Sequence, residues 1–386
     1  MLNSNQSLTD PIEDVFEEIS REITIESNRD VQPVQVIQEK LDAILKKIHQ
    51  KLFIGNCFED IYHQNNSFVV ISNFVHSIQH TGFVTKFDKL EDISRNPKKF
   101  ANFDYGSINS SCCLNSNFLL GFDSGDLVVV DDELYKITSK QYCHNLITKV
   151  LADPKGDRLV CSDFDGRIVL IDSNDFEAIQ YYDYAHASSI TDMIFNQDRN
   201  DLLISSGADN QIVLWDLRRS LSDRPATILV ECNVQPTALD WPEKNIVSFG
   251  TETGQILQAD LRKNRSVVSK HTLFSELDPK MTENDCSIHR IRPLIDQCGD
   301  LNYSIVFSAN NHWIFDRKFT RLLQHQEYPK QIEPRDCLQL NENKDLLIVG
   351  THSTRNKTKK KEKLYKNISV KLSIEKIYTT KERRLS

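Results

Sequence analysis

Short runs of apolar residues, separated by polar turn residues, follow one another along most of the chain. The stretch from Leu202 to Asp216 indicates a strand, a tight turn at Asp209-Asn210 and a second strand that ends in Trp215-Asp216. Short runs rich in Val, Ile and Leu and bounded by Gly, Asn or Asp are typical of β-strands. Because Asn and Gly readily adopt the positive φ of a tight hairpin, the pattern predicts two strands joined by a hairpin turn.

Similar turns recur at a nearly constant spacing. Degenerate copies of the hairpin have their turns at Gly82, Gly125, Gly166, Asn210, Gly254 and Asn310. The first five lie 41 to 44 residues apart, and 56 residues separate the last two because a polar stretch at 275–287 is inserted. A period of roughly 40–45 residues with four short strands indicates a β-propeller, in which each sheet buries its faces against two neighbours.

We therefore expect an all-β fold, a seven-bladed propeller over residues 53–353. The expected blades lie at about 53–90, 107–135, 146–176, 186–219, 235–263, 288–320 and from 335. The seventh is irregular, because a lysine-rich stretch follows its second strand. Residues 368–374 alternate in polarity and fit either a strand after an insertion or a loose tail. Residues 354–386 as a whole are predicted to be a basic, disordered tail.

Residues 1–52 are predicted to be an acidic extension with two helices. Asp10-Pro11 indicates an N-cap followed by proline at the first helical position, and apolar residues at helical spacing follow up to Ile23. A second apolar stripe runs from Ile37 to Leu52. The first helix either binds a partner or packs on the propeller, and packing is favoured for the second.

The stretch from Leu202 to Asp216 resembles the signature half of a WD repeat. In such repeats a histidine before the first strand, a hydroxyl residue on the second strand, an aspartate in the turn and a tryptophan on the third strand form a hydrogen-bonded chain. The matching residues here are His186, Ser205, Asp209 and Trp215. The resemblance implies that this set is structural, and that it is not a catalytic His–Asp–Ser arrangement.

The order of motifs over residues 53–353 is also similar to that of the WD-repeat subunits of the methylosome. The stretches that carry this resemblance are Leu119–Gly125, Tyr184–Ala187, Leu203–Arg218, Gln235–Pro242 and Phe249–Gly254. The resemblance implies a non-catalytic scaffold that binds a type II protein arginine methyltransferase in a hetero-oligomer. It further implies that the scaffold helps present basic substrates, histones and Sm proteins, in the cytoplasm and the nucleus.

In that family a tryptophan in a loop of the first blade contacts the methyltransferase. The matching position here is His80, so His80, Thr81 and Phe83 are the expected partner-binding residues. Histidine stacks and hydrogen-bonds, but it offers less contact area than tryptophan.

A second interpretation comes from the tetrad Trp215-Asp216-Leu217-Arg218. It fits the W-D-x-R pattern of substrate receptors of cullin–RING ubiquitin ligases, and Asp260-Leu261-Arg262 repeats part of it. In this alternative Arg218 would donate hydrogen bonds to acidic or carbonyl groups of the ligase adaptor.

Charge is distributed unevenly. The chain has a net charge of −8, residues 355–386 carry 12 basic and 3 acidic side chains, and the other 354 residues are therefore strongly acidic. An acidic body favours basic partners. Nucleic acid is an expected partner only of the basic tail, which also fits a nuclear import signal.

Other sequence features exclude several classes of protein. The nine cysteines lack C-x-x-C spacing, which predicts free thiols in a reducing compartment, without disulfides or a zinc site. No apolar run is long enough for a membrane span, and no signal peptide is expected. The sequence contains no P-loop, G-x-S-x-G or H-E-x-x-H motif, so we expect neither an enzyme nor a bound metal or cofactor.

Overall fold

The computed structural model describes residues 57–76, 79–89, 98–219, 226–263, 267–272, 287–295, 301–308, 310–328, 332–339, 346–354 and 367–375. The chain divides into two units, Met1–Phe53 and Ile54–Ser386, and every described residue belongs to the second. The two helices predicted in residues 1–52 therefore lie outside the described residues. Within the described ranges, no helix is long and apolar enough to cross a membrane.

The strands form antiparallel sheets in chain order, and the first three sheets have four strands each. The first sheet contains β1 (Cys57–Gln64), β2 (Ser67–His76), β3 (Gln79–Phe87) and β4 (Lys99–Phe103). The second contains β5 (Ile108–Leu114), β6 (Asn117–Phe122), β7 (Asp126–Val130) and β8 (Lys136–Gln141). The third contains β9 (Ile147–Ala152), β10 (Arg158–Asp163), β11 (Ile168–Asp172) and β12 (Ala178–Tyr182).

Three more four-stranded sheets and one three-stranded sheet follow. The fourth contains β13 (Ile190–Phe195), β14 (Leu202–Gly207), β15 (Gln211–Asp216) and β16 (Ala226–Glu231). The fifth contains β17 (Pro236–Glu243), β18 (Ile246–Thr251), β19 (Gln255–Asp260) and β20 (Val267–Thr272). The sixth contains β21 (Ile288–Ile295), β22 (Leu301–Ser308), β23 (Asn311–Asp316) and β24 (Leu322–Glu327). The last contains β25 (Ile332–Gln339), β26 (Leu346–Thr354) and β27 (Asn367–Glu375).

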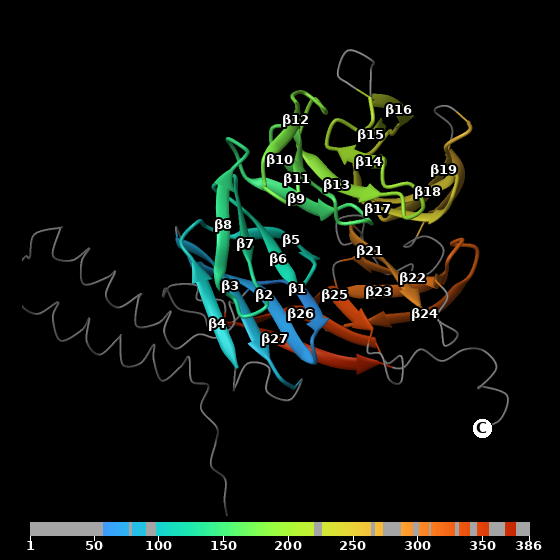
Figure 1. Cartoon of the computed structure of the whole chain (residues 1–386). Coiled ribbons are helices and arrows are strands. Elements are labelled where there is room, and N and C mark those ends of the chain that lie inside the picture. The colour runs from blue at the N-terminus through green and yellow to red at the C-terminus, as the bar shows by residue number, and fades with distance from the viewer. Residues whose placement is uncertain are drawn as a thin grey trace, which may run out of the picture. The chain divides into compact units, whose positions relative to one another are not determined.

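The sheets are the blades of a propeller. The first strands of successive sheets (β1, β5, β9, β13, β17, β21 and β25) contact one another in that order, and β25 contacts β1. Figure 1 shows the first sheet, in blue, beside the last, in red. The apolar core lies between neighbouring blades: one cluster, for example, joins Leu119 and Val129 of the second sheet to Val150 and Leu159 of the third. This packing places turns and connections at the rims, where partners reach them.

The structure corrects the expected seven-bladed propeller: in the described residues it has six four-stranded blades and a last sheet of three strands. The third strand of that sheet, β27, pairs with β26 over its whole length, from Thr354↔Asn367 to Leu346↔Glu375. Of the two alternatives for residues 368–374, the structure has the strand that follows an insertion, so Asn367–Glu375 is not part of a loose tail.

The expected blade boundaries were also too short. They omitted the fourth strand of each of the first six sheets, such as β8 and β12. These outer strands are half exposed, and β8 has no fully buried residue. An edge strand that buries little needs few apolar residues, so its hydrophobic pattern is weak.

Candidate functional site

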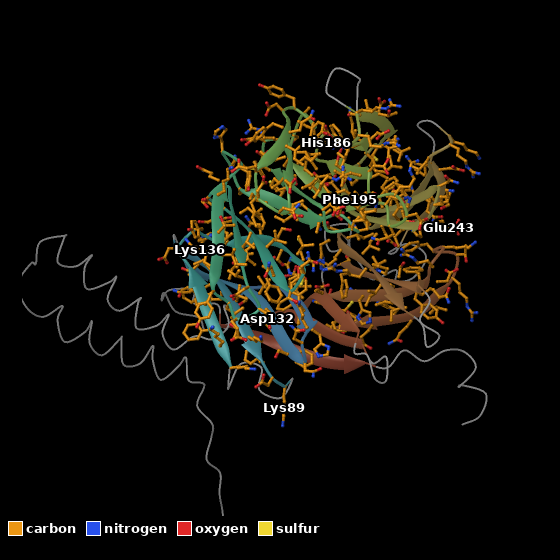
Figure 2. The ribbon with its side chains drawn as sticks, viewed as in Figure 1. Lys89, Asp132, Lys136, His186, Phe195 and Glu243 are labelled. Atoms are coloured by element: carbon orange, nitrogen blue, oxygen red, sulfur yellow. The ribbon has the colours of Figure 1, made fainter. Side chains whose placement is uncertain are left out.

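The four residues matched to a WD repeat meet in one buried chain in the fourth blade. Nδ1 of His186 lies 3.0 and 3.1 Å from the two carboxylate oxygens of Asp209, and its Nε2 lies 2.7 Å from Oγ of Ser205. Trp215 donates from Nε1 to the same Oγ at 2.8 Å. Figure 2 labels His186 at the boundary between the third and fourth blades.

The direction of each hydrogen bond in this chain follows from the chemistry of the groups. An indole N–H can only donate, so Ser205 accepts from Trp215 and gives its own proton to Nε2 of His186. A carboxylate can only accept, so Nδ1 of His186 donates to Asp209. Because each group is already paired, with Ser205 fully buried and His186 nearly so, the chain joins the blade connection to the sheet and has no exposed nucleophile.

In the third blade, two cysteines occupy the positions of His186 and Ser205. Cys143 and His186 each lie four residues before the first strand of a blade, and each donates its backbone N–H to a glycine carbonyl of the preceding turn. Cys161 occupies the position of Ser205, and its thiol contacts that of Cys143. That contact, with burial, raises the pKa of Cys143 far above its ordinary value. The thiol of Cys143 is therefore a protonated packing group.

The three predicted partner-binding residues of the first blade differ in exposure. The side chain of His80 is 42% exposed and is oriented by Ser107, at 3.2 Å, and by Asp123, at 3.7 Å. Thr81 is buried, and Phe83 has no exposed surface. Phe83 is thus a correction to the sequence analysis: its ring packs inside the blade, and it offers no area to a partner. Of the three, His80 presents the accessible surface.

Arg218 lies on the surface, with its side chain 61% exposed. Its guanidinium donates to both oxygens of Asp216, at 2.8 and 2.7 Å, and pairs with Asp201 at 2.9 Å. Arg262 makes the same two-oxygen contact with Asp260. In both places the arginine's own backbone N–H also donates to the aspartate, so the D-x-R sequence builds a local turn with a fixed guanidinium.

A charged cluster where the ring closes has no signal in the sequence. This closure cluster consists of Asp60 on β1, Arg290 and Arg292 on β21, and Asp336 on β25. Arg290 reaches Asp336 at 2.8 Å and Asp60 at 3.3 Å, and Arg292 reaches them at 3.1 and 3.2 Å. The cluster thereby joins the first, sixth and last blades. More than 200 residues separate Asp60 from its partners, so no local motif could reveal the cluster.

The charges of the closure cluster affect the pKa values of its own carboxyl groups and of a neighbouring one. Burial alone would raise the pKa of Asp336, but Arg290 and Arg292 outweigh it and hold that pKa well below the ordinary value. Burial raises the pKa of the adjacent Glu59 to about 7, although Arg335 and Arg290 oppose the rise. Asp336 is therefore ionised at neutral pH, whereas Glu59 is poised near half-protonation.

Neither metal-site geometry nor an exposed reactive group stands out in the described part of the chain. Among these residues, no three His, Cys, Asp or Glu side chains lie close enough together to hold a metal ion. The cysteines described as free thiols include Cys112, Cys143 and Cys337, and burial raises the pKa of Cys112 and Cys337 above the ordinary value.

Comparison with known families agrees with this geometry. Residues 179–216 match the family described as WD domain, G-beta repeat. The match begins on β12, the outer strand of the third blade, and ends at Asp216 on β15, so it spans the whole hydrogen-bonded chain from His186 to Trp215. Residues 179–216 are therefore similar to a WD repeat, and they lie within a ring of antiparallel blades.

Proposed function

We propose that this protein is a non-catalytic scaffold that binds a type II protein arginine methyltransferase and helps present basic proteins, such as histones and Sm proteins, to it. The complex would act in the cytoplasm and the nucleus. The observation that carries the proposal is His80, which lies exposed at the position where the methylosome resemblance places the enzyme contact. Ser107 and Asp123 orient its ring, so a partner meets a pre-organised side chain.

The electrostatics of the body support a basic substrate. The residues outside 355–386 carry a large excess of acidic side chains, which raises the local concentration of cationic segments and speeds their association. The polar residues that resemble a hydrolytic triad are occupied in the His186 chain. Presentation, rather than chemistry, is the role that this distribution favours.

The test is purification of the tagged full-length protein from cells, with bound proteins identified by mass spectrometry. We expect an arginine methyltransferase in stoichiometric amount. His80→Ala should reduce its recovery and His80→Trp should increase it, because tryptophan offers more contact area. Tyr135→Ser, which changes a 65% exposed residue elsewhere, is the matched control. Absence of the enzyme beside another stoichiometric partner would refute the proposal.

The second candidate function is that of a substrate receptor of a cullin–RING ubiquitin ligase. It is favoured by the exposed and rigidly oriented guanidinium of Arg218. The chain offers its own control, since Arg262 makes the same aspartate contact in the next blade. Arg218→Ala should abolish adaptor binding while Arg262→Ala leaves it intact. Equal behaviour of the two variants, or no adaptor binding by the unchanged protein, would exclude this function.

A further inference from the structure

Exposed apolar side chains are concentrated on three blades. In the described part of the chain, the large hydrophobic residues that are exposed are Phe100, Tyr135, Ile137, Phe164, Ile179, Tyr181, Tyr184 and Val267. All but Val267 lie between β4 and the connection to the fourth blade. Five of these seven lie on or beside outer strands, whereas Phe164 and Tyr184 lie in a turn and in a connection between blades.

Phe164 and Tyr184 belong to segments that touch. The turn after β10 packs against the connection after β12: His186 donates its backbone N–H to the carbonyl of Gly166 at 3.0 Å. A Cβ added to Gly166 would lie 2.4 Å from the carbonyl oxygen of His186 and 2.6 Å from that of Ser188. Each aromatic residue is two positions from this contact. Phe164 is 53% exposed and Tyr184 is 91% exposed, so both side chains reach solvent from two segments that this contact holds together.

Two exposed carboxylates flank the rings, and with them form what we call the aromatic-acidic patch: Phe164, Asp165, Asp183 and Tyr184. Asn145 donates to Oδ1 of Asp165 at 3.1 Å, and Nε of Arg167 lies 2.6 Å from Oδ1 of Asp183. These contacts hold each carboxylate through one oxygen. The patch thus combines fixed negative charge with exposed ring faces.

The surroundings of the patch are acidic as well. On this side of the ring, the described turns and connections of the second to fifth blades carry one basic residue, Arg167, and six acidic ones: Asp104, Asp123, Asp165, Asp183, Asp209 and Glu252. The opposite side mixes both signs, with Lys155, Arg199, Arg218 and Arg262 among its loop residues. The charge asymmetry selects a cationic partner for the patch and disfavours nucleic acid.

We infer that the aromatic-acidic patch binds an arginine-bearing basic segment of another protein. A guanidinium stacks on an aromatic face through both its charge and its plane, and it pairs with a carboxylate through two N–H groups. The patch offers both kinds of group within one area. A lysine ammonium also attracts the carboxylates and the ring by its charge, but it cannot stack as a plane or donate two parallel hydrogen bonds to one carboxylate. The inference rests on the proposed scaffold role, but not on which enzyme the scaffold holds.

The test measures binding of fluorescent peptides to the full-length protein by anisotropy. The probes are a peptide of alternating glycine and arginine, the same peptide with lysine and the same peptide with glutamate. We expect the arginine peptide to bind several-fold more tightly than the lysine peptide, and the glutamate peptide not to bind. Phe164→Ser combined with Tyr184→Asn should weaken arginine-peptide binding about tenfold. Asparagine suits position 184 because the backbone there has φ of 59°.

Asp183→Asn should weaken binding and flatten its dependence on salt, since one ionic contact is lost. Tyr135→Ser, on an outer edge, is the matched aromatic control and should bind like the unchanged protein. Equal affinity for the arginine and lysine peptides, or unchanged binding by the Phe164/Tyr184 variant, would overturn the inference. The methyltransferase purification is an independent experiment. If the protein binds the arginine peptide but no enzyme is recovered, only the proposed enzyme partner is refuted. If the enzyme is recovered but the peptide does not bind, only the proposed function of the aromatic-acidic patch is refuted.

Discussion

Replacing the Ser205 hydroxyl should destabilise the propeller far more than the loss of one oxygen atom implies. The hydroxyl serves two buried groups, as acceptor for Trp215 and as donor to His186. In Ser205→Ala the indole N–H and the imidazole Nε2 both lose their partner inside the protein. A buried polar group left unpaired costs about 1–3 kcal/mol, so the expected loss in the free energy of unfolding is about 2–5 kcal/mol.

Ser206 is the matched control, because it is the next residue on β14 and is also fully buried. Its hydroxyl bonds to Thr191 at 2.8 Å, but Thr191 also donates to the carbonyl of Pro236. Ser206→Ala therefore leaves Thr191 with a partner and should cost only about 1 kcal/mol. The two variants together distinguish the free-energy cost of leaving buried groups unpaired from the cost of removing a buried hydroxyl.

The assay is urea unfolding monitored by tryptophan fluorescence and circular dichroism, with the midpoint compared at unchanged slope. A double-mutant cycle adds a second criterion: Trp215→Phe should cost less in the Ser205→Ala background than in the unchanged protein, because it removes the orphaned N–H. Equal costs for Ser205→Ala and Ser206→Ala, together with additive behaviour of Trp215→Phe, would refute the double role of the Ser205 hydroxyl.

Three further outcomes follow from the structure. The folded-state pKa of Glu59, about 7, lies above its ordinary value of 4.5, so its contribution to stability is present below pH 4.5 and is lost as pH rises through 7. Glu59→Gln should therefore gain up to about 3 kcal/mol over the unchanged protein in urea unfolding at pH 8 and nothing at pH 4. Arg290→Met removes a guanidinium from the buried carboxylate of Asp336, and should lower the unfolding free energy by about 3 kcal/mol at pH 7. Gly166→Ala meets both a φ of 83° and the carbonyl of His186, and should lower the melting temperature by the equivalent of about 1–3 kcal/mol in a thermal scan.

The regular parts of this fold could be predicted from the sequence because they repeat. Turns at Gly125, Gly166 and Gly254 have positive φ, as does Asn210, so four of the six residues that marked the period are types that the backbone needs there. The other two do not have positive φ, and Gly82 lies inside β3 and not in a turn. Buried second and third strands such as β10 and β11 carry continuous apolar runs. Outer strands bury little and lack such runs, which explains why the predicted blades ended too early.

The candidate site was only partly predictable, for a different reason. The His186 chain could be named in advance because its members lie within 30 residues and form a recurrent pattern. The closure cluster and the aromatic-acidic patch depend on which residues the ring brings together. Phe83 shows the opposite error, since adjacency to His80 in sequence says nothing about which side of the strand is buried.

Among the described residues, the fourth blade alone carries the full histidine chain, and the neighbouring blades vary at its positions. The third blade replaces two members by Cys143 and Cys161, and the fifth has Cys232 at the histidine position. Apolar packing between blades stabilises these repeats without the His186-type hydrogen bonds. The polar residues of their turns are therefore not needed for those bonds. Asp165, the counterpart of Asp209, accepts from Asn145 on the surface instead of binding a buried histidine. A repeat that no longer needs its turn carboxylate internally can present it to a partner, and this is why the proposed arginine-binding patch lies on the third blade, beside the most complete repeat.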